Sequence, residues 1–65
     1  MLEIRAKVGT GPMTIIYIGW KRNLPMVGDR IKFRSFPYHK REKWHTGIVS
    51  QIKDVGHPLY YIDRF

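Results

Sequence analysis

The stretch from Val27 to Asp63 reads VGDRIKFRSFPYHKREKWHTGIVSQIKDVGHPLYYID, and it carries the signals that decide the fold. Within it, short segments that alternate apolar and polar side chains are separated by turn residues at Gly28-Asp29 and from Asp54 to Pro58. Alternation with a period of two predicts half-buried strands, whereas Gly, Asp and Pro favour turns. The stretch therefore predicts three strands, over Arg30 to Phe36, Trp44 or Thr46 to Lys53, and Leu59 to Arg64.

The N-terminal third of the chain predicts two further strands. From Leu2 to Val8 apolar residues alternate with charged ones, and Gly9 to Pro12 form a cluster that breaks a strand and favours a hairpin. From Met13 to Trp20 the chain is apolar on both alternations. This pattern predicts a central strand that is covered on both sides. No helical period lasts for more than about two turns, so the predicted class is all-β, a small barrel or sandwich.

The order of these features resembles small Tudor-type and SH3-like β-barrels. The resemblance rests on Val27-Gly28-Asp29, Trp44 three residues before Gly47, Val49 with Ile52, and Leu59-Tyr60 with Ile62-Asp63. It covers a little over half of the chain and leaves the N-terminal hairpin outside. Together with the strand pattern, it predicts a single-domain barrel of about five short antiparallel strands over residues 1–65, with an N-terminal hairpin at about 2–20 and the remainder at about 27–65. Members that capture methylated peptides combine aromatic residues with an acidic one. The loop between Phe36 and Trp44 is basic instead, which argues against that kind of cage.

Composition adds a strong charge signal. The 65 residues include 12 Lys and Arg against 5 Asp and Glu, which gives a formal net charge of +7. So positive a surface attracts polyanions such as nucleic acid, acidic proteins or anionic lipid. The chain has no cysteine, which excludes disulfides and thiolate zinc sites.

Two neighbouring segments concentrate cations where phosphates could bind. Alternation places Arg30, Lys32 and Arg34 on one face of their predicted strand, opposite Ile31 and Phe33. The following loop mixes cations with aromatic residues, and an exposed aromatic ring can stack on an unpaired base. The predicted nucleic-acid-binding residues are Arg30, Lys32, Arg34, Tyr38, Lys40, Arg41 and Lys43. They favour binding of DNA or RNA with little regard to sequence.

The remaining aromatic and basic residues leave alternatives open. Trp44 is expected to pack on the core, and Tyr38 to be exposed. Tyr60 and Tyr61 fall on opposite faces of the last strand, so one is expected in the core and the other on the surface. Four further cations join the interface only if the N-terminal hairpin docks beside it; they are Arg5, Lys7, Lys21 and Arg22.

Catalysis, metal binding and cofactors find no support in the sequence. The three histidines, His39, His45 and His57, lack the spacing of a metal site. Neither Ser35 nor Ser50 lies in a nucleophile motif, and the carboxylates form no paired-acid motif. We therefore expect no enzyme activity and no cofactor, and we expect Asp29 to accept hydrogen bonds from turn backbone.

The main alternative function is a protein-interaction module or inhibitor whose basic face docks an acidic partner, since complementary charge steers association. Small one-domain chains of this kind are typical of phage and mobile-element accessory proteins. A homo-oligomer is a third expectation, because so small a core is marginally stable alone. The longest apolar run, Met13 to Ile18, is far shorter than the ~20 residues of a spanning helix, and no signal peptide is evident. We expect no membrane partner and a cytoplasmic location.

Overall fold

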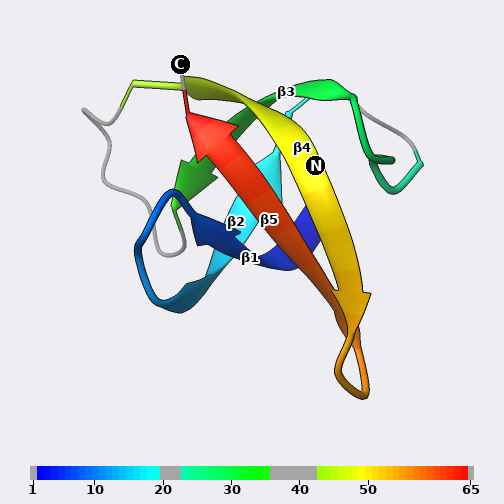
Figure 1. Ribbon diagram of the computed structural model, residues 1–65. Helices are drawn as coiled ribbons and strands as arrows, with labels where there is room; N and C mark the ends of the chain where they lie inside the picture. Colours follow the sequence, from blue (N-terminus) through cyan, green and yellow to red (C-terminus); the bar gives the residue numbers. More distant parts are fainter. Residues whose placement is uncertain (1, 20–22, 36–42, 65) are drawn as a thin grey trace.

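The chain folds into a small closed β-barrel (Figure 1). The computed structural model describes residues 2–19, 23–35 and 43–64, and within these ranges it contains strands and no helix. The five strands are β1 (Leu2–Val8), β2 (Met13–Ile18), β3 (Arg30–Ser35), β4 (His45–Asp54) and β5 (Pro58–Arg64). The predicted all-β barrel of five short strands is confirmed, and it is compatible with an SH3-like fold.

The strands follow one another around the barrel, and the odd number of strands decides how it closes. Each strand pairs antiparallel with the next, from β1 to β5. Because the direction alternates, the first and fifth strands run the same way, and β1 closes the barrel by pairing parallel with β5. The backbone N–H of Gly9 extends this seam by donating to the carbonyl of Ile62 at 2.9 Å. The N-terminal hairpin therefore supplies two of the five strands and docks against β5.

The core fills the barrel with alternate residues from every strand. Its buried residues are Ile4, Ala6, Ile16, Ile18, Ile31, Phe33, Val49, Tyr60 and Ile62, with Leu2 and Val8 packed against them. β-Branched and aromatic residues dominate this set, as expected for the pleated inner face of a sheet. As far as the structure describes the chain, the core is thus apolar except for the phenol of Tyr60, and the described Lys and Arg side chains lie outside it.

The strand predicted from Met13 is present, but the prediction that it is covered on both sides is wrong. β2 ends at Ile18, its first two residues are exposed, and its outward residues Ile15 and Tyr17 are only half-buried. In a barrel of this size, side chains of the same chain cover just the inner face of each strand. Apolar residues at the outward positions therefore remain partly open to solvent. Trp20 lies outside the described residues.

Gly47 allows β4 to approach β5 more closely than another residue could. A Cβ atom at this position would lie 2.7 Å from Cγ2 of Ile62 and 2.8 Å from the carbonyl oxygen of Asp63. Both distances are shorter than real Cβ contacts. The glycine of the Trp44-x-x-Gly47 pattern is therefore required by packing between the strands.

The turn before β3 is closed by Asp29, as predicted. Its carboxylate accepts a hydrogen bond from the backbone N–H of Met26 at 2.9 Å, and its own N–H donates to the carbonyl of Met26 at 3.0 Å. Gly28 has a φ of 94°, in the left-handed region that favours glycine. These contacts position Arg30 at the first residue of β3.

A β-bulge interrupts β4 at Ser50. On one side of it Val49 pairs with Ile62, and on the other Gln51 pairs with Tyr61, so Ser50 has no partner in the ladder. The Ser50 hydroxyl instead donates to the carbonyl of Tyr61 at 3.1 Å. An extra residue in one strand reverses which side chains face outward beyond it. Val49 points into the core, whereas Lys53, four residues later, lies on the outer face of the barrel together with Tyr61.

Candidate nucleic-acid interface

The outer face of β3 presents two exposed cations beside a shallow depression. Arg30 and Lys32 are both exposed, and the burial of β3 alternates as predicted, with Ile31 and Phe33 buried between and beyond them. A depression of about 340 Å³ is lined by Arg30, Ile31, Lys32 and Thr46. Thr46 pairs directly with Lys32 across the β3–β4 ladder. Two cations and a hydroxyl around a depression match the groups that bind phosphate oxygens.

Arg34 shares the face of Arg30 and Lys32 but is held differently. It is half-buried, its Nε atom is buried, and its guanidinium carbon lies 4.9 Å from the ring centre of Trp44. The Trp44 ring packs in turn on Gly19, where an added Cβ would lie 3.0 Å from the ring. Arg34 therefore stacks on an aromatic face and is half-buried, whereas Arg30 and Lys32 are exposed.

Trp44 is half-buried and does not belong to the buried core, so the prediction of a core tryptophan holds only in part. It lies just before β4 and rests on the backbone of Gly19, outside the barrel interior. The adjacent Lys43 is exposed. The other predicted loop residues, Tyr38, Lys40 and Arg41, lie outside the described residues.

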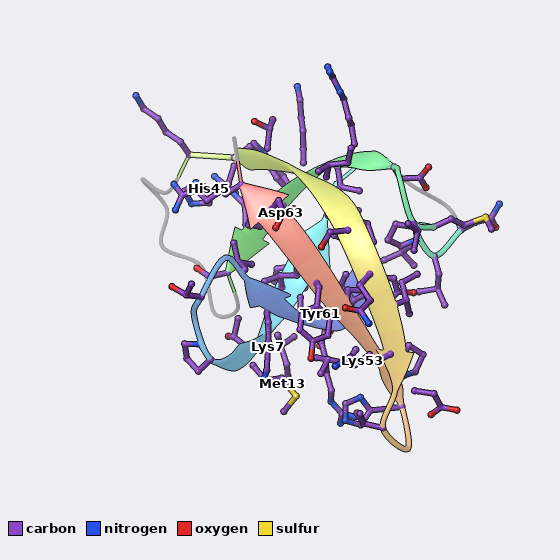
Figure 2. The ribbon with its side chains drawn as sticks, viewed as in Figure 1. Lys7, Met13, His45, Lys53, Tyr61 and Asp63 are labelled. Atoms are coloured by element: carbon purple, nitrogen blue, oxygen red, sulfur yellow. The ribbon has the colours of Figure 1, made fainter. Side chains whose placement is uncertain are left out.

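A second group of cations surrounds Tyr61 on the outer face of β5, and we call Lys7, Lys53 and Tyr61 the Tyr61 cluster. The Nζ atom of Lys7 lies 5.9 Å from the ring centre of Tyr61, and that of Lys53 lies 5.2 Å from it. Figure 2 shows the two lysines on either side of the tyrosine, with Met13 beyond Lys7. Both distances fall within the range of cation–π interactions.

The Tyr61 cluster joins residues of β1, β4 and β5 through two features, the parallel seam and the bulge. The parallel seam places Lys7 directly beside Tyr61, because these two residues pair in register between β1 and β5. The bulge at Ser50 turns Lys53 of β4 to the same face. On the far side of Lys7, Met13 of β2 pairs with it and is 50% exposed. The cluster therefore exists only once the barrel has closed.

Tyr60 and Tyr61 divide between the two faces as predicted. Tyr60 is 3% exposed and belongs to the core, whereas Tyr61 is half-buried on the outer face. Burial raises the pKa of the Tyr60 hydroxyl above its usual value. Tyr60 also lines an open cavity of about 330 Å³, together with Glu3, Arg5, His57 and other residues near the end of the β4–β5 hairpin.

The β3 cations and the Tyr61 cluster are separated by one acidic position. Across the register, Arg30 pairs with Ile48 and Ile48 pairs with Asp63, so an exposed carboxylate stands two strands from Arg30. At the strand spacing of about 4.8 Å this is a separation of roughly 10 Å. Next to Asp63, a guanidinium nitrogen of Arg64 lies 3.0 Å from Nδ1 of His45. Within the described ranges, the β3 cations and the lysines beside Tyr61 are therefore two separate groups, not one continuous track.

The sequence anticipated the first group and missed the second. From the sequence, Lys7 is only a further charge near the interface, and Tyr61 is only one of two tyrosines that fall on opposite faces of the last strand. The available signal was the alternation of β1 and β5, which puts both residues on outward positions. Their contact also depends on which strand closes the barrel, and this cannot be read from local alternation.

Within the described residues, no three His, Asp or Glu side chains gather where they could hold a metal ion. The same part of the chain has no helix that is long and apolar enough to cross a membrane. Comparison of the chain with protein-family models, curated proteins and solved structures finds no match. The fold and the two groups of cations are therefore the features that bear on function.

Proposed function

We propose that this barrel binds DNA or RNA, mainly through the phosphate backbone and with little regard to sequence. The observation that carries the proposal is the pair of exposed cations Arg30 and Lys32, which line one depression on β3 in a chain of net charge +7. Phosphate binding by Lys and Arg releases condensed counterions and supplies most of the affinity of sequence-independent binding. Lys43 and the predicted loop residues Tyr38, Lys40 and Arg41 extend the proposed interface along the chain.

We also propose that the barrel is related to the SH3-like group, and within it to Tudor-type modules. The closed meander of five strands supports this, together with the Gly28-Asp29 turn before β3 and the close approach at Gly47. Since barrels of this kind serve many functions, the relationship by itself selects no ligand. The exposed cations, not the fold, favour nucleic acid as the ligand.

The test is fluorescence anisotropy of nuclease-treated protein with labelled duplex DNA, single-stranded DNA and RNA at several salt concentrations. The double variant R30A/K32A should bind more weakly to every sequence and lose about one unit of salt slope per phosphate contact removed. The charge-preserving variant R30K/K32R is the matched control and should keep most of the slope. Equal affinity and slope for wild type and R30A/K32A would contradict the proposed site.

The loop has its own test. Replacement of Lys40, Arg41 and Lys43 by alanine should weaken binding uniformly across sequences and lower the salt slope by about one per lost phosphate contact. If both affinity and slope remain at wild-type values, the loop cations do not contribute to the interface.

A second candidate function is docking on an acidic protein, and one observation favours it. Immediately before β3, Leu24, Met26 and Val27 are 54%, 71% and 60% exposed. Apolar side chains beside cations suit a protein interface, where a buried apolar centre is bordered by charge. The test is co-purification after nuclease treatment: a protein partner stays bound, whereas nucleic acid is removed along with its absorbance at 260 nm.

A further inference from the structure

We propose that the Tyr61 cluster is a stacking site for one unpaired base of a single-stranded nucleic acid, with Lys7 and Lys53 binding the phosphates beside that base. This inference rests on the proposed function and adds a second site to it. None of its three residues belongs to the interface predicted around β3. It also specifies the form of the ligand, since it requires a base that is free of its complementary strand.

The position of Tyr61 supports the assignment. Its neighbours along β5, Tyr60 and Ile62, are 3% and 1% exposed and belong to the core, but Tyr61 is half-buried on the outer face. It is therefore not needed to fill the barrel. A tyrosine ring standing on the outside of a sheet offers a flat apolar face, and every base has a matching face irrespective of its identity.

The two lysines supply the second requirement, which is positive charge next to the ring. Their Nζ atoms lie 5.9 Å (Lys7) and 5.2 Å (Lys53) from the ring centre, and they come from the strands on the two sides of β5. Figure 2 shows this arrangement. A cation–π contact at an exposed site is weaker than the stacking of a base on an aromatic ring. A base can thus displace one ammonium from the ring, and the released ammonium stays within reach of the phosphate that follows the base.

The surroundings favour nucleic acid over an acidic peptide at this site. A peptide carboxylate would use the lysines but gain nothing from the ring face, whereas a nucleotide uses both. Next to Lys7, Met13 is 50% exposed and adds apolar surface against which a second base could lie. Duplex DNA can bind the lysines through its phosphates, but its bases are already stacked on one another and cannot reach the ring.

The experiment compares four ligands with three proteins. The ligands are a labelled oligothymidine, an abasic oligomer of equal length, a DNA duplex and poly-glutamate; the proteins are wild type, Y61L and Y61F. Y61L removes the ring and keeps an apolar side chain, while Y61F keeps the ring and is the matched control. We expect Y61L to bind oligothymidine about 5- to 150-fold more weakly, the range that corresponds to loss of one stacked base. Y61F should bind like wild type, and binding of Y61L to the abasic oligomer and to the duplex should change less than about twofold.

The outcomes separate this inference from the function on which it rests. If wild type binds oligothymidine with a steep salt dependence and Y61L binds it equally well, the stacking site is wrong and the phosphate interface stands. If wild type binds no nucleic acid even at low salt, the proposed function itself fails. If poly-glutamate binds wild type as tightly as oligothymidine and the abasic oligomer do, the cluster recognises charge alone and suits an acidic protein. Circular dichroism of each variant shows whether it is folded.

Discussion

The Nζ atom of Lys53 lies 5.2 Å from the ring centre of Tyr61, although strict alternation along β4 would direct Lys53 into the core with Val49. The bulge at Ser50 causes the difference, because one extra residue reverses the alternation beyond it. Through this bulge a residue that strict alternation would direct inward becomes part of an outer-face site. The cluster of Tyr61 with two lysines thus depends on an irregularity in the sheet.

We predict that Lys53→Ala lowers the salt dependence of single-strand binding, because one phosphate contact is lost. The slope of log K against log salt should decrease in magnitude by about 0.7 for each contact removed. Lys7→Ala should have the same effect, and the double variant about twice the effect. Lys53→Arg keeps the charge and should preserve the slope. An unchanged slope in the double variant would show that these lysines do not contact phosphate.

Arg34 and Lys32 share a face of β3, but we predict that replacing Arg34 lowers stability whereas replacing Lys32 lowers nucleic-acid affinity. Arg34 is half-buried over Trp44 at 4.9 Å, so Arg34→Ala should remove packing and destabilise the fold by about 0.5–2 kcal/mol. Lys32 is exposed, so Lys32→Ala should weaken nucleic-acid binding and leave stability nearly unchanged. Urea unfolding and anisotropy on both variants provide the comparison. Equal loss of stability in the two variants would contradict the distinction.

Gly47→Ala should destabilise the barrel. The added methyl group would lie 2.7 Å from Ile62 Cγ2 and 2.8 Å from the Asp63 carbonyl oxygen, so β4 and β5 would have to separate. Overpacking of this kind costs about 1–3 kcal/mol, and each kcal/mol lowers the Tm of a domain this small by about 4–8 °C. Thermal unfolding followed by circular dichroism measures the shift. Thr46→Ala, at the exposed neighbouring position, is the control. If Gly47→Ala has the same Tm as Thr46→Ala, the added methyl group is accommodated without loss of stability and the prediction is wrong.

Tyr60 should make the stability of the barrel depend on alkaline pH. Burial raises the pKa of its hydroxyl in the folded state above the usual value of 10.0, so the folded state holds its proton where the unfolded state has lost it. This contribution to stability is fully present below pH 10.0 and is lost as the pH rises through the raised folded-state pKa. Urea unfolding between about pH 8 and 11 measures the loss. The variant Tyr60→Phe cannot ionise, so its stability should fall less over this range than that of wild type; parallel curves would contradict the prediction.

Local alternation was sufficient for much of the fold. The segments Leu2 to Val8 and Arg30 to Phe36 were predicted as strands, and the structure has strands at Leu2–Val8 and Arg30–Ser35. The two signals used, alternation and turn residues, are short-range. A period of two places side chains on alternate faces, and Gly, Asp and Pro select turn geometries. A strand was also predicted from Met13 and is present as Met13–Ile18, but its expected cover on both sides is absent, because apolar composition does not show whether another layer covers the outer face.

Part of the candidate site followed from the same signals. Arg30 and Lys32 were predicted on one face of a strand and lie there, since burial alternates from Arg30 to Phe33. Trp44 was predicted to pack on the core, but it is half-buried and lies outside the buried core. Its packing on Gly19 joins residues far apart in the chain, and nothing in the local sequence indicates that contact.

The sequence by itself determined that this protein is all-β, strongly basic and divided into five short strands, because composition and period-two alternation are properties of neighbouring residues. Only the tertiary structure decided that the barrel closes by parallel pairing of β1 with β5, which sets Lys7 beside Tyr61. It also decided that a bulge at Ser50 brings Lys53 to the same ring. The physical reason is that closure and bulges depend on hydrogen bonds between segments distant in the chain, and their combined geometry places three residues from three strands around one site.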